Sequence, residues 1–405
     1  MKLPTIVMIG CFDTKAEDFG YLYTCLKQRE IEVMAINTGV LGTTERFPVD
    51  IEAERVAHAG GSALAKLRTN KDRGRAIEVM GSGAAEVIKD LLAANNIKGI
   101  IGMGGGGGTY IVLAAMQGVP FGIPKLCLST LATKDLSEKI GNMDILLMPS
   151  IVDVAGLNAI SRVLIRQAAG ALHGMIDAPG AVAQKSLGSI AMSVFGNTQI
   201  CADSCSELLK QRDYDVLAFH AVGSGGKTME VLASEGLFDG MLDLTTTELA
   251  DELCGGICSA GPKRLTAASE RGIPQVVAPG CLDMVNFGAM DTVPEKYKAR
   301  QLYSWAPDVT LMRTNKEENR ILGETIAKKL NLSKGPVTVL LPLEGLSKIG
   351  ARGEAFHDPE TDQVLFETLK AHLDKKIKVL EIQANINTSE FAQQGVKSLM
   401  NLIEN

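Results

Sequence analysis

Residues 97–117 read IKGIIGMGGGGGTYIVLAAMQ, the strand–glycine–helix pattern of a βα unit. An apolar run ends at Met103 and a helix-like run opens at Thr109. The residues between them are five glycines, Gly104, Gly105, Gly106, Gly107 and Gly108. Each costs the folded chain roughly 0.5–1 kcal/mol relative to alanine, because glycine loses the most conformational freedom on folding. The pattern predicts a loop whose N–H groups hold a phosphate or carboxylate, rather than a tight turn packed without a ligand, for which one or two glycines would suffice.

The rest of the chain alternates short apolar runs with stretches of helical periodicity. This alternation is typical of parallel sheets with helices on both faces. We expect two doubly wound, mostly parallel Rossmann-like α/β domains, residues 1–180 and 185–405, facing a shared cleft. The expected strands are 5–9, 32–36, 98–103, 125–128, 144–148, 189–194, 215–219, 241–244, 274–278, 309–313, 337–341 and 378–382.

The two halves also read as a repeat. Sliding the chain by 183 positions places Phe12 on Phe195 and residues 26–30 (LKQRE) on residues 209–213 (LKQRD). Both segments then run strand, polar loop, helix, strand, so the pattern indicates a duplication.

Composition restricts the class of protein. The chain has 405 residues, 46% hydrophobic and 22% charged, with a formal net charge of −6 and no basic block. This is typical of a globular protein, and it predicts neither a nucleic-acid partner nor an anionic membrane partner.

We find no signal-like N-terminus and no run long enough to span a bilayer, so we expect a cytoplasmic protein. The eight cysteines include Cys201/Cys205 and Cys254/Cys258, whose spacing zinc tolerates, but buried free thiols are the better interpretation.

Polar residues follow the first expected strand. Thr14 and Glu17 have the spacing of a capping box at the start of a helix. Asp13 is also suited to ordering Mg²⁺, and Lys15 to meeting a phosphate at the same helix end.

Other strand ends carry glycines and hydroxyls. Asn37 and Gly39 begin a long loop that we interpret as contacting a nucleotide. Arg73 and Arg75 open the next helix and could reach a phosphate, but a solvated charged turn is the better interpretation. The remaining polar groups expected at this edge are Ser129, Thr130, Ser150 and Asp153.

The second half offers a different set of candidates. Residues 221–228 (AVGSGGKT) nearly fit a P-loop but lack its first glycine, so a second anion-binding turn beside His220 is the better interpretation. Asp283 follows a later strand, and His357 with Asp358 lies in a glycine-rich loop suited to acid–base work. Asp358-Pro359 equally reads as the cap and first turn of a helix.

Several of these motifs together resemble the tomato mosaic virus resistance protein family. They are GxFDTK at 10–15, NTG at 37–39, MGGGGGT at 103–109, DVAGLN at 153–158, the glycine turn at 223–226, PGCxD at 279–283 and FHDP at 356–359. The resemblance implies two α/β halves, ATP and Mg²⁺ bound in the first half, a protein partner and homodimers. It assigns nucleotide contacts to residues 13–15, 37, 39 and 104–109, and no catalytic residue.

We therefore expect a Mg²⁺–ATP-binding protein, an enzyme acting on a small anionic substrate at the cleft, with transferase or ligase chemistry. Two alternatives stay open. One is a nucleotide-independent hydrolase or lyase of a sugar-acid-like substrate that uses His220, Asp283 or His357. The other is a nucleotide sensor that binds a protein partner.

Overall fold

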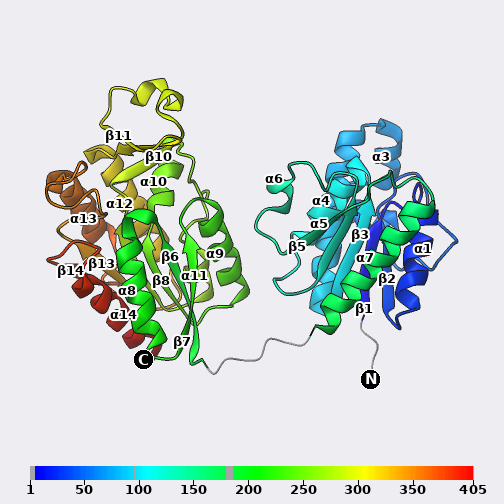
Figure 1. Ribbon diagram of the computed structural model, residues 1–405, viewed down its shortest axis with the longest axis horizontal. Helices are drawn as coiled ribbons and strands as arrows, with labels where there is room; N and C mark the ends of the chain where they lie inside the picture. The colour runs from blue at the N-terminus through cyan, green and yellow to red at the C-terminus, as the bar shows by residue number, and fades with distance from the viewer. Residues whose placement is uncertain (1–4, 95–96, 179–185, 405) are drawn as a thin grey trace. The chain divides into compact units, whose positions relative to one another are not determined.

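The computed structural model describes residues 5–94, 97–178 and 186–404. The chain divides into two compact units, Met1–Ala181 and Val182–Asn405, each with its own sheet (Figure 1). The predicted domain ends at 180 and 185 lie outside the described residues.

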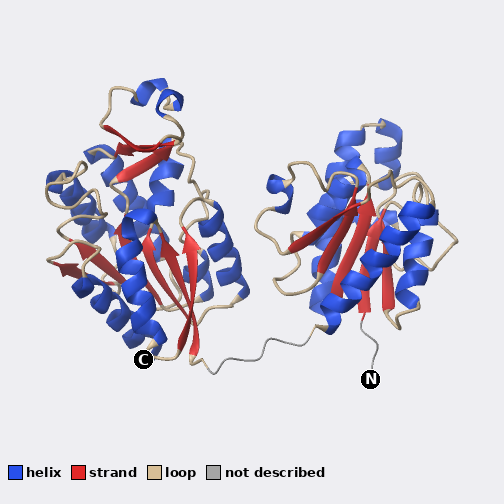
Figure 2. Cartoon of the chain, in the orientation of Figure 1, coloured by secondary structure: helices blue, strands red, loops and turns tan. Residues whose placement is uncertain are grey.

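The N-terminal unit contains one parallel sheet with the strand order β2-β1-β3-β4-β5. Helices α1 and α7 pack on one face, and α4 and α5, with α2, on the other (Figure 2). The doubly wound sheet predicted from the sequence is confirmed. Its strands are β1 (Thr5–Gly10), β2 (Glu32–Asn37), β3 (Ile97–Gly104), β4 (Lys125–Ser129) and β5 (Ile145–Pro149), and its helices α1 (Ala16–Lys27), α2 (Ala53–Ala59), α3 (Leu64–Asn70), α4 (Arg73–Ala94), α5 (Gly106–Met116), α6 (Ser137–Ile140) and α7 (Ala159–Asp177).

The C-terminal unit has a parallel sheet with the order β14-β13-β9-β8-β6-β7. Helices α8 and α14 cover one face, and α9 to α13 pack on the other. The strands are β6 (Gly188–Val194), β7 (Tyr214–His220), β8 (Gly240–Thr245), β9 (Gln275–Gly280), β13 (Val337–Pro342) and β14 (Lys378–Ile382). The helices are α8 (Gln199–Lys210), α9 (Ser224–Glu235), α10 (Thr247–Cys254), α11 (Ala267–Arg271), α12 (Lys316–Asn331), α13 (Pro359–His372) and α14 (Ser389–Glu404), with 3₁₀ turns Gly196–Thr198, Met290–Thr292 and Glu295–Tyr297.

A small antiparallel sheet corrects one expectation. We expected 309–313 to continue the parallel alternation, but β12 (Val309–Arg313) lies between β10 (Met284–Phe287) and β11 (Leu302–Ala306) in a separate sheet. Only residues 281–283 separate β9 from β10. A parallel partner needs a crossover of about a dozen residues, so β10 leaves the main sheet and pairs antiparallel.

The repeat predicted from the sequence appears in the structure. Helix α1 begins at Ala16 and α8 at Gln199, 183 positions later, and both have 12 residues. Glu30 and Asp213, also 183 apart, both adopt the left-handed conformation, with φ of 58° and 60°. In both units the second strand lies at the edge beside the first, and the later strands follow in chain order on the other side.

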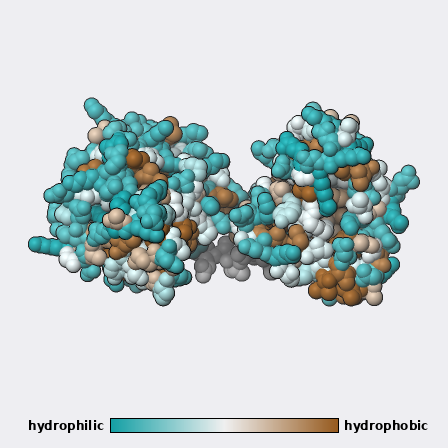
Figure 3. Space-filling view, turned by 90° about the horizontal axis from the view of Figure 1, so that it is seen from above, coloured by the Kyte–Doolittle hydropathy of each residue, from teal (hydrophilic) through white to brown (hydrophobic). Residues whose placement is uncertain are grey.

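The interiors explain why these runs become parallel strands. β8, β9 and β13 are buried along their whole length, as expected for strands covered on both faces. On the surface drawn in Figure 3, hydrophobic residues form separate patches among hydrophilic ones. Among the described residues, no helix combines the length and apolar character needed to cross a membrane.

Candidate functional site

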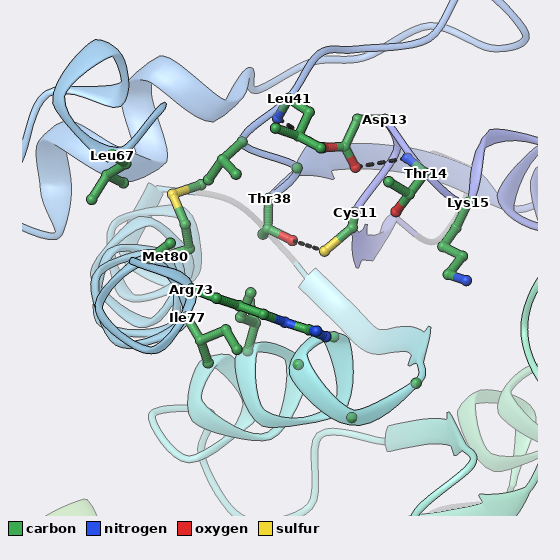
Figure 4. Close-up of a pocket in the computed structure, with 18 of the residues that line it drawn as sticks. Cys11, Asp13, Thr14, Lys15, Thr38, Leu41, Leu67, Arg73, Ile77 and Met80 are labelled. Carbon is green, nitrogen blue, oxygen red and sulfur yellow. Dashed lines mark hydrogen bonds between the residues drawn. The ribbon is translucent and has the colours of Figure 1, made fainter. Parts of the chain in front are cut away.

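A cavity of about 700 Å³ opens at the carboxyl ends of β1, β2 and β3 (Figure 4). The strand order reverses here, because β1 is flanked by β2 on one side and β3 on the other. Ligands of open α/β sheets bind at this kind of position. We call it the main cavity.

The glycine run forms the start of a helix and not the loop that we expected. α5 begins at Gly106 with Gly105 as its N-cap, three residues earlier than predicted. No side chain caps this helix. The N–H groups of its first turn have no partner within the helix, so they remain available to an anion.

Steric space separates the five glycines into two groups. A Cβ atom at Gly104 would lie 2.8 Å from the Cα of Gly108, so the backbone requires glycine there, and one at Gly107 would lie 2.9 Å from Cδ1 of Ile77, the flexible end of a side chain that would have to shift. At Gly105 and Gly108 the nearest atoms would be 3.7 and 3.8 Å away, and at Gly106 no atom lies within 4 Å. None of the five has a positive φ. Packing therefore leaves three glycines unexplained, whereas the close approach of a ligand explains them.

Two cationic side chains lie at the same end of the cavity. Arg73 opens α4 and extends beside Gly107, and Lys15 is the N-cap residue of α1 (Figure 4). Neither side chain has a hydrogen-bond or ion-pair partner in the described part of the chain. Arg75, the other arginine considered from the sequence, is exposed and pairs with Glu78 at 3.2 Å. The structure therefore places Arg73 at the site and Arg75 outside it.

Part of the lining of the main cavity is apolar, and sequence reasoning missed it. It is formed mainly by Leu67, Ile77, Met80 and Ile111. Helical periodicity marks such residues as one face of a helix, but it does not tell a cavity wall from a packed core.

Asp13 joins the loops after β1 and β2. Its two carboxylate oxygens accept hydrogen bonds from the N–H groups of Thr14 (2.7 Å) and Leu41 (2.8 Å). A Cβ at Gly39 would lie 2.3 Å from the Asp13 carboxyl carbon, so glycine is needed there for the close approach.

The predicted capping box is wrong: α1 begins at Ala16, and no side chain caps it. Thr14 lies outside the helix because residues 11–15 form a turn, closed by the Lys15 N–H on the Cys11 carbonyl at 3.1 Å.

Three other predicted contacts are used by the fold. The side-chain oxygen Oδ1 of the buried Asn37 accepts hydrogen bonds from the N–H groups of Phe12 (3.2 Å) and Gly39 (2.8 Å). The hydroxyls of Thr109 and Ser129 are 2.6 Å apart and buried. None of these three side chains lines the main cavity, so they organise the strand ends around it.

Cys11 lines the cavity and was not singled out from the sequence. Its thiol lies 3.6 Å from the Thr38 hydroxyl, and burial raises its pKa. The protein holds eight free cysteines, as predicted, and Cys11 alone among them is not buried. The described residues contain no group of three or more His, Cys, Asp or Glu side chains arranged to hold a metal ion.

The glycine turn of the C-terminal unit already contains an anion. The Glu248 carboxylate accepts from the N–H groups of Gly223 (2.7 Å) and Gly226 (3.1 Å). Gly223 has a φ of +86°, and a Cβ at Gly225 or Gly226 would lie 1.9 or 2.1 Å from another atom. The fold therefore requires these glycines. The position that we predicted for a second external anion is occupied by the Glu248 carboxylate.

Glu248 belongs to a buried ion network that the sequence did not reveal. Arg264 is fully buried and pairs with Asp243 (2.5 Å), Glu248 (2.6 Å) and Glu230 (3.4 Å). These four residues come from separate segments, so no local spacing signals the network.

The predicted acid–base residues are only partly brought together. Asp283 is fully buried; burial raises its pKa, and it accepts a 2.6 Å hydrogen bond from Ser347. A Cβ at Gly350 would lie 2.4 Å from Asp283, and the Gly350 carbonyl lies 3.3 Å from Nδ1 of the exposed His357, so Gly350 separates the two side chains.

Asp358 and His220 lie outside this pair. Asp358 is the N-cap of α13 and accepts from the Thr361 N–H at 3.1 Å and the Thr361 hydroxyl at 2.6 Å, which confirms the cap interpretation. His220 ends the edge strand β7, where its ring lies 5.6 Å from that of Phe195, and β6 and β8 separate β7 from β9. The structure does not assemble His220 with the other candidates.

These observations define a two-unit α/β protein whose N-terminal unit has a glycine-lined cavity at the switch point of its sheet. The chain belongs to the uncharacterised protein family UPF0261: the family's N-terminal domain matches residues 4–181 and its C-terminal domain residues 188–403. The likeness to the tomato family is confirmed at this level.

Similar proteins come from bacteria and a plant. A UPF0261 protein of Clostridium tetani is 44% identical over 98% of this chain and 99% of its own length. The ToMV resistance protein Tm-1(GCR237) of Solanum lycopersicum is 36% identical over 82% of this chain and 45% of its own length. Among solved structures, the UDP-N-acetylglucosamine 2-epimerase of Rickettsia bellii is 12% identical, over 68% of this chain and 78% of its own, and its TM-score of 0.24 is too low to carry an argument.

Proposed function

We propose that the N-terminal unit binds ATP in the main cavity, with the phosphates at the start of α5 and the adenine against the apolar wall. The observation that carries this proposal is the set of three glycines, Gly105, Gly106 and Gly108, for which neither packing nor backbone conformation has a use. The uncapped first turn of α5 supplies N–H donors, and Arg73 and Lys15 supply positive charge.

The cavity also suits the rest of the nucleotide. Its volume of about 700 Å³ lies within the range usual for sites of cofactors and small molecules. Leu67, Ile77 and Met80 offer an apolar surface on which a purine is desolvated. We therefore expect ATP to bind more tightly than inorganic triphosphate, which has the charge without the base.

Magnesium fits here only together with the phosphates. Each oxygen of the Asp13 carboxylate accepts one backbone hydrogen bond and keeps a lone pair free, and the residue lines the main cavity. Mg²⁺ is commonly held by one or two carboxylates plus substrate phosphates. We propose Asp13 as its protein contact, and an ATP-dependent transferase or ligase as the class of enzyme.

Calorimetry on the full chain tests the binding. Titration with Mg²⁺–ATP is expected to give saturable heat, with inorganic triphosphate binding more weakly. If neither heat nor a thermal shift is seen at millimolar ATP, nucleotide binding is removed as the function.

A further inference from the structure

A second cavity of about 480 Å³ lies at the carboxyl ends of β4 and β5. It is lined by the turn after β4, the loop after β5 and the start of α5, and we call it the side cavity. Gly105, Gly106 and Asp153 line both this cavity and the main cavity. A ligand in the side cavity would therefore lie next to whatever occupies the start of α5.

Three side chains of the side cavity have unused hydrogen-bonding capacity. In the described part of the chain, neither the hydroxyls of Thr130 and Thr133 nor the carboxylate of Asp153 has an intrachain partner. The other two hydroxyls are occupied: Ser129 accepts from the N–H of Leu131 at 2.9 Å, and Ser150 donates to the carbonyl of Val152 at 2.7 Å.

The side chains around the side cavity disfavour a negatively charged ligand. None of the residues that line it is Lys, Arg or His, and its one charged side chain is the Asp153 carboxylate. An anion that does not reach the N–H groups at the start of α5 would have no cationic side chain to pair with, and Asp153 would repel it. A carboxylate next to free hydroxyls instead matches a ligand that both donates and accepts hydrogen bonds without carrying a negative charge.

We propose that the side cavity binds an uncharged, hydroxyl-rich small molecule of the sugar or polyol class, held by Asp153, Thr130 and Thr133. Asp153 accepts hydrogen bonds from the ligand's hydroxyls, and the two threonines donate or accept. This class differs from the anionic substrate expected from the sequence. If the polyol is a co-substrate of ATP, that role rests on the proposed ATP site. The binding of the polyol to the side cavity does not depend on the ATP site.

Saturation-transfer NMR on the full chain tests this proposal with defined probes. Glycerol, ribose and glucose are compared with glycerate, an anion, and ethanolamine, a cation, each with and without Mg²⁺–ATP. Ribose or glucose is expected to bind in both conditions. Thr133→Val, which removes one hydroxyl at nearly constant volume, should weaken that binding about threefold, and Asp153→Asn about tenfold, because bonds to a charged group are the stronger ones. Thr69→Val, on α3 and lining neither cavity, should leave it unchanged.

The outcomes separate this proposal from the ATP site. The side-cavity proposal is overturned if no uncharged probe binds, if glycerate or ethanolamine binds more tightly, or if the Asp153 and Thr133 variants bind polyols like the wild type. If polyols bind as expected while ATP gives no heat, the ATP site is overturned and the side cavity stands.

Discussion

Glu248 accepts a 2.7 Å hydrogen bond from the backbone N–H of Gly223, and this contact fills the glycine turn of the C-terminal unit with the protein's own carboxylate. The same side chain pairs with the buried Arg264 at 2.6 Å. At the start of α5, in the N-terminal unit, no side chain takes this position. The two glycine-rich turns thus differ: one encloses a carboxylate of the protein itself, and the other has no side-chain cap.

Removing the charge of Glu248 is expected to destabilise the C-terminal unit. Glu248→Gln leaves Arg264 buried with one anionic partner fewer and weakens the hold on the turn. Breaking a buried ion pair typically costs about 3 kcal/mol or more. Urea unfolding measures the loss, and Glu270→Gln, at an exposed position, is the control. A loss no larger than that of the control would show that the network adds little to stability.

Gly106→Ala separates ligand binding from folding. Open space surrounds Gly106, and alanine is the better helix former, so stability should stay equal or rise by about 0.5–1 kcal/mol. The added methyl group narrows the approach to the first-turn N–H groups, and ATP affinity should fall about tenfold, or 1.4 kcal/mol. Gly174→Ala, also exposed and in open space within α7, is the matched control and should keep full affinity. Unchanged ATP binding by the Gly106 variant would argue against phosphates at this turn.

Arg73 and Arg75 form a matched pair on one helix. Arg73→Ala removes an unpaired guanidinium from the cavity and should weaken ATP binding about tenfold to a hundredfold, since hydrogen bonds to charged groups contribute about 1.5–3 kcal/mol. Arg75→Ala, outside the cavity, should change it little. Calorimetry at two salt concentrations measures both. Equal losses of ATP affinity in the two variants would mean that the positive charge at the start of α4 acts at long range, and that Arg73 does not contact the ligand.

Cys11 reports on the main cavity independently of any activity. It is the partly exposed cysteine among eight free thiols, and its raised pKa keeps it in the less reactive thiol form at neutral pH. We expect a small alkylating reagent to modify Cys11 slowly and ahead of the seven others, and Mg²⁺–ATP to protect it. Mass spectrometry after timed labelling locates the adduct. Labelling that ATP does not slow would place the nucleotide elsewhere.

The buried Asp251 should make stability depend on pH. Burial raises its pKa from 3.8 to about 7, although the N–H groups of Cys258 and Asn286 act in the opposite direction. The folded state then binds the proton more tightly than the unfolded state, so this group's contribution is complete below about pH 4 and is lost as the pH rises towards 7.

The comparison with Asp251→Asn isolates that contribution. The free energy of unfolding of the wild type should fall between pH 4 and 7 more steeply than that of the variant, by up to about 1.4 kcal/mol per pH unit. Urea titrations across this range measure the difference. Parallel pH profiles would show that Asp251 is ionised in the folded protein throughout.

The sequence predicted the fold well because parallel strands and their helices have local signatures. Thr5–Gly10, Glu32–Asn37 and Lys378–Ile382 are strands close to the expected positions, and the offset of 183 residues matches α1 to α8. Local signatures did not predict how a strand pairs when the pairing depends on which neighbouring strand it can reach. β12 has a strand's sequence, but its pairing followed from the short turn between β9 and β10.

The candidate site was predicted only in part for the same reason. Asp13, Lys15 and residues 105–108 line the main cavity, whereas Gly104, Asn37, Thr109 and Ser129 do not line it and contact the rest of the fold. The walls from α3 and α4 are recognisable only once those helices lie against the glycine turn.

Spacing and composition along the chain were enough to predict two α/β units, the succession of their strands and the glycine-rich turns at the strand ends, because these features are local. Contacts between distant segments set which of the two turns is filled by a carboxylate of the protein. Glu248 is separated by a helix and a strand from the turn it fills, and nothing near Gly223 in the sequence indicates that it will arrive there.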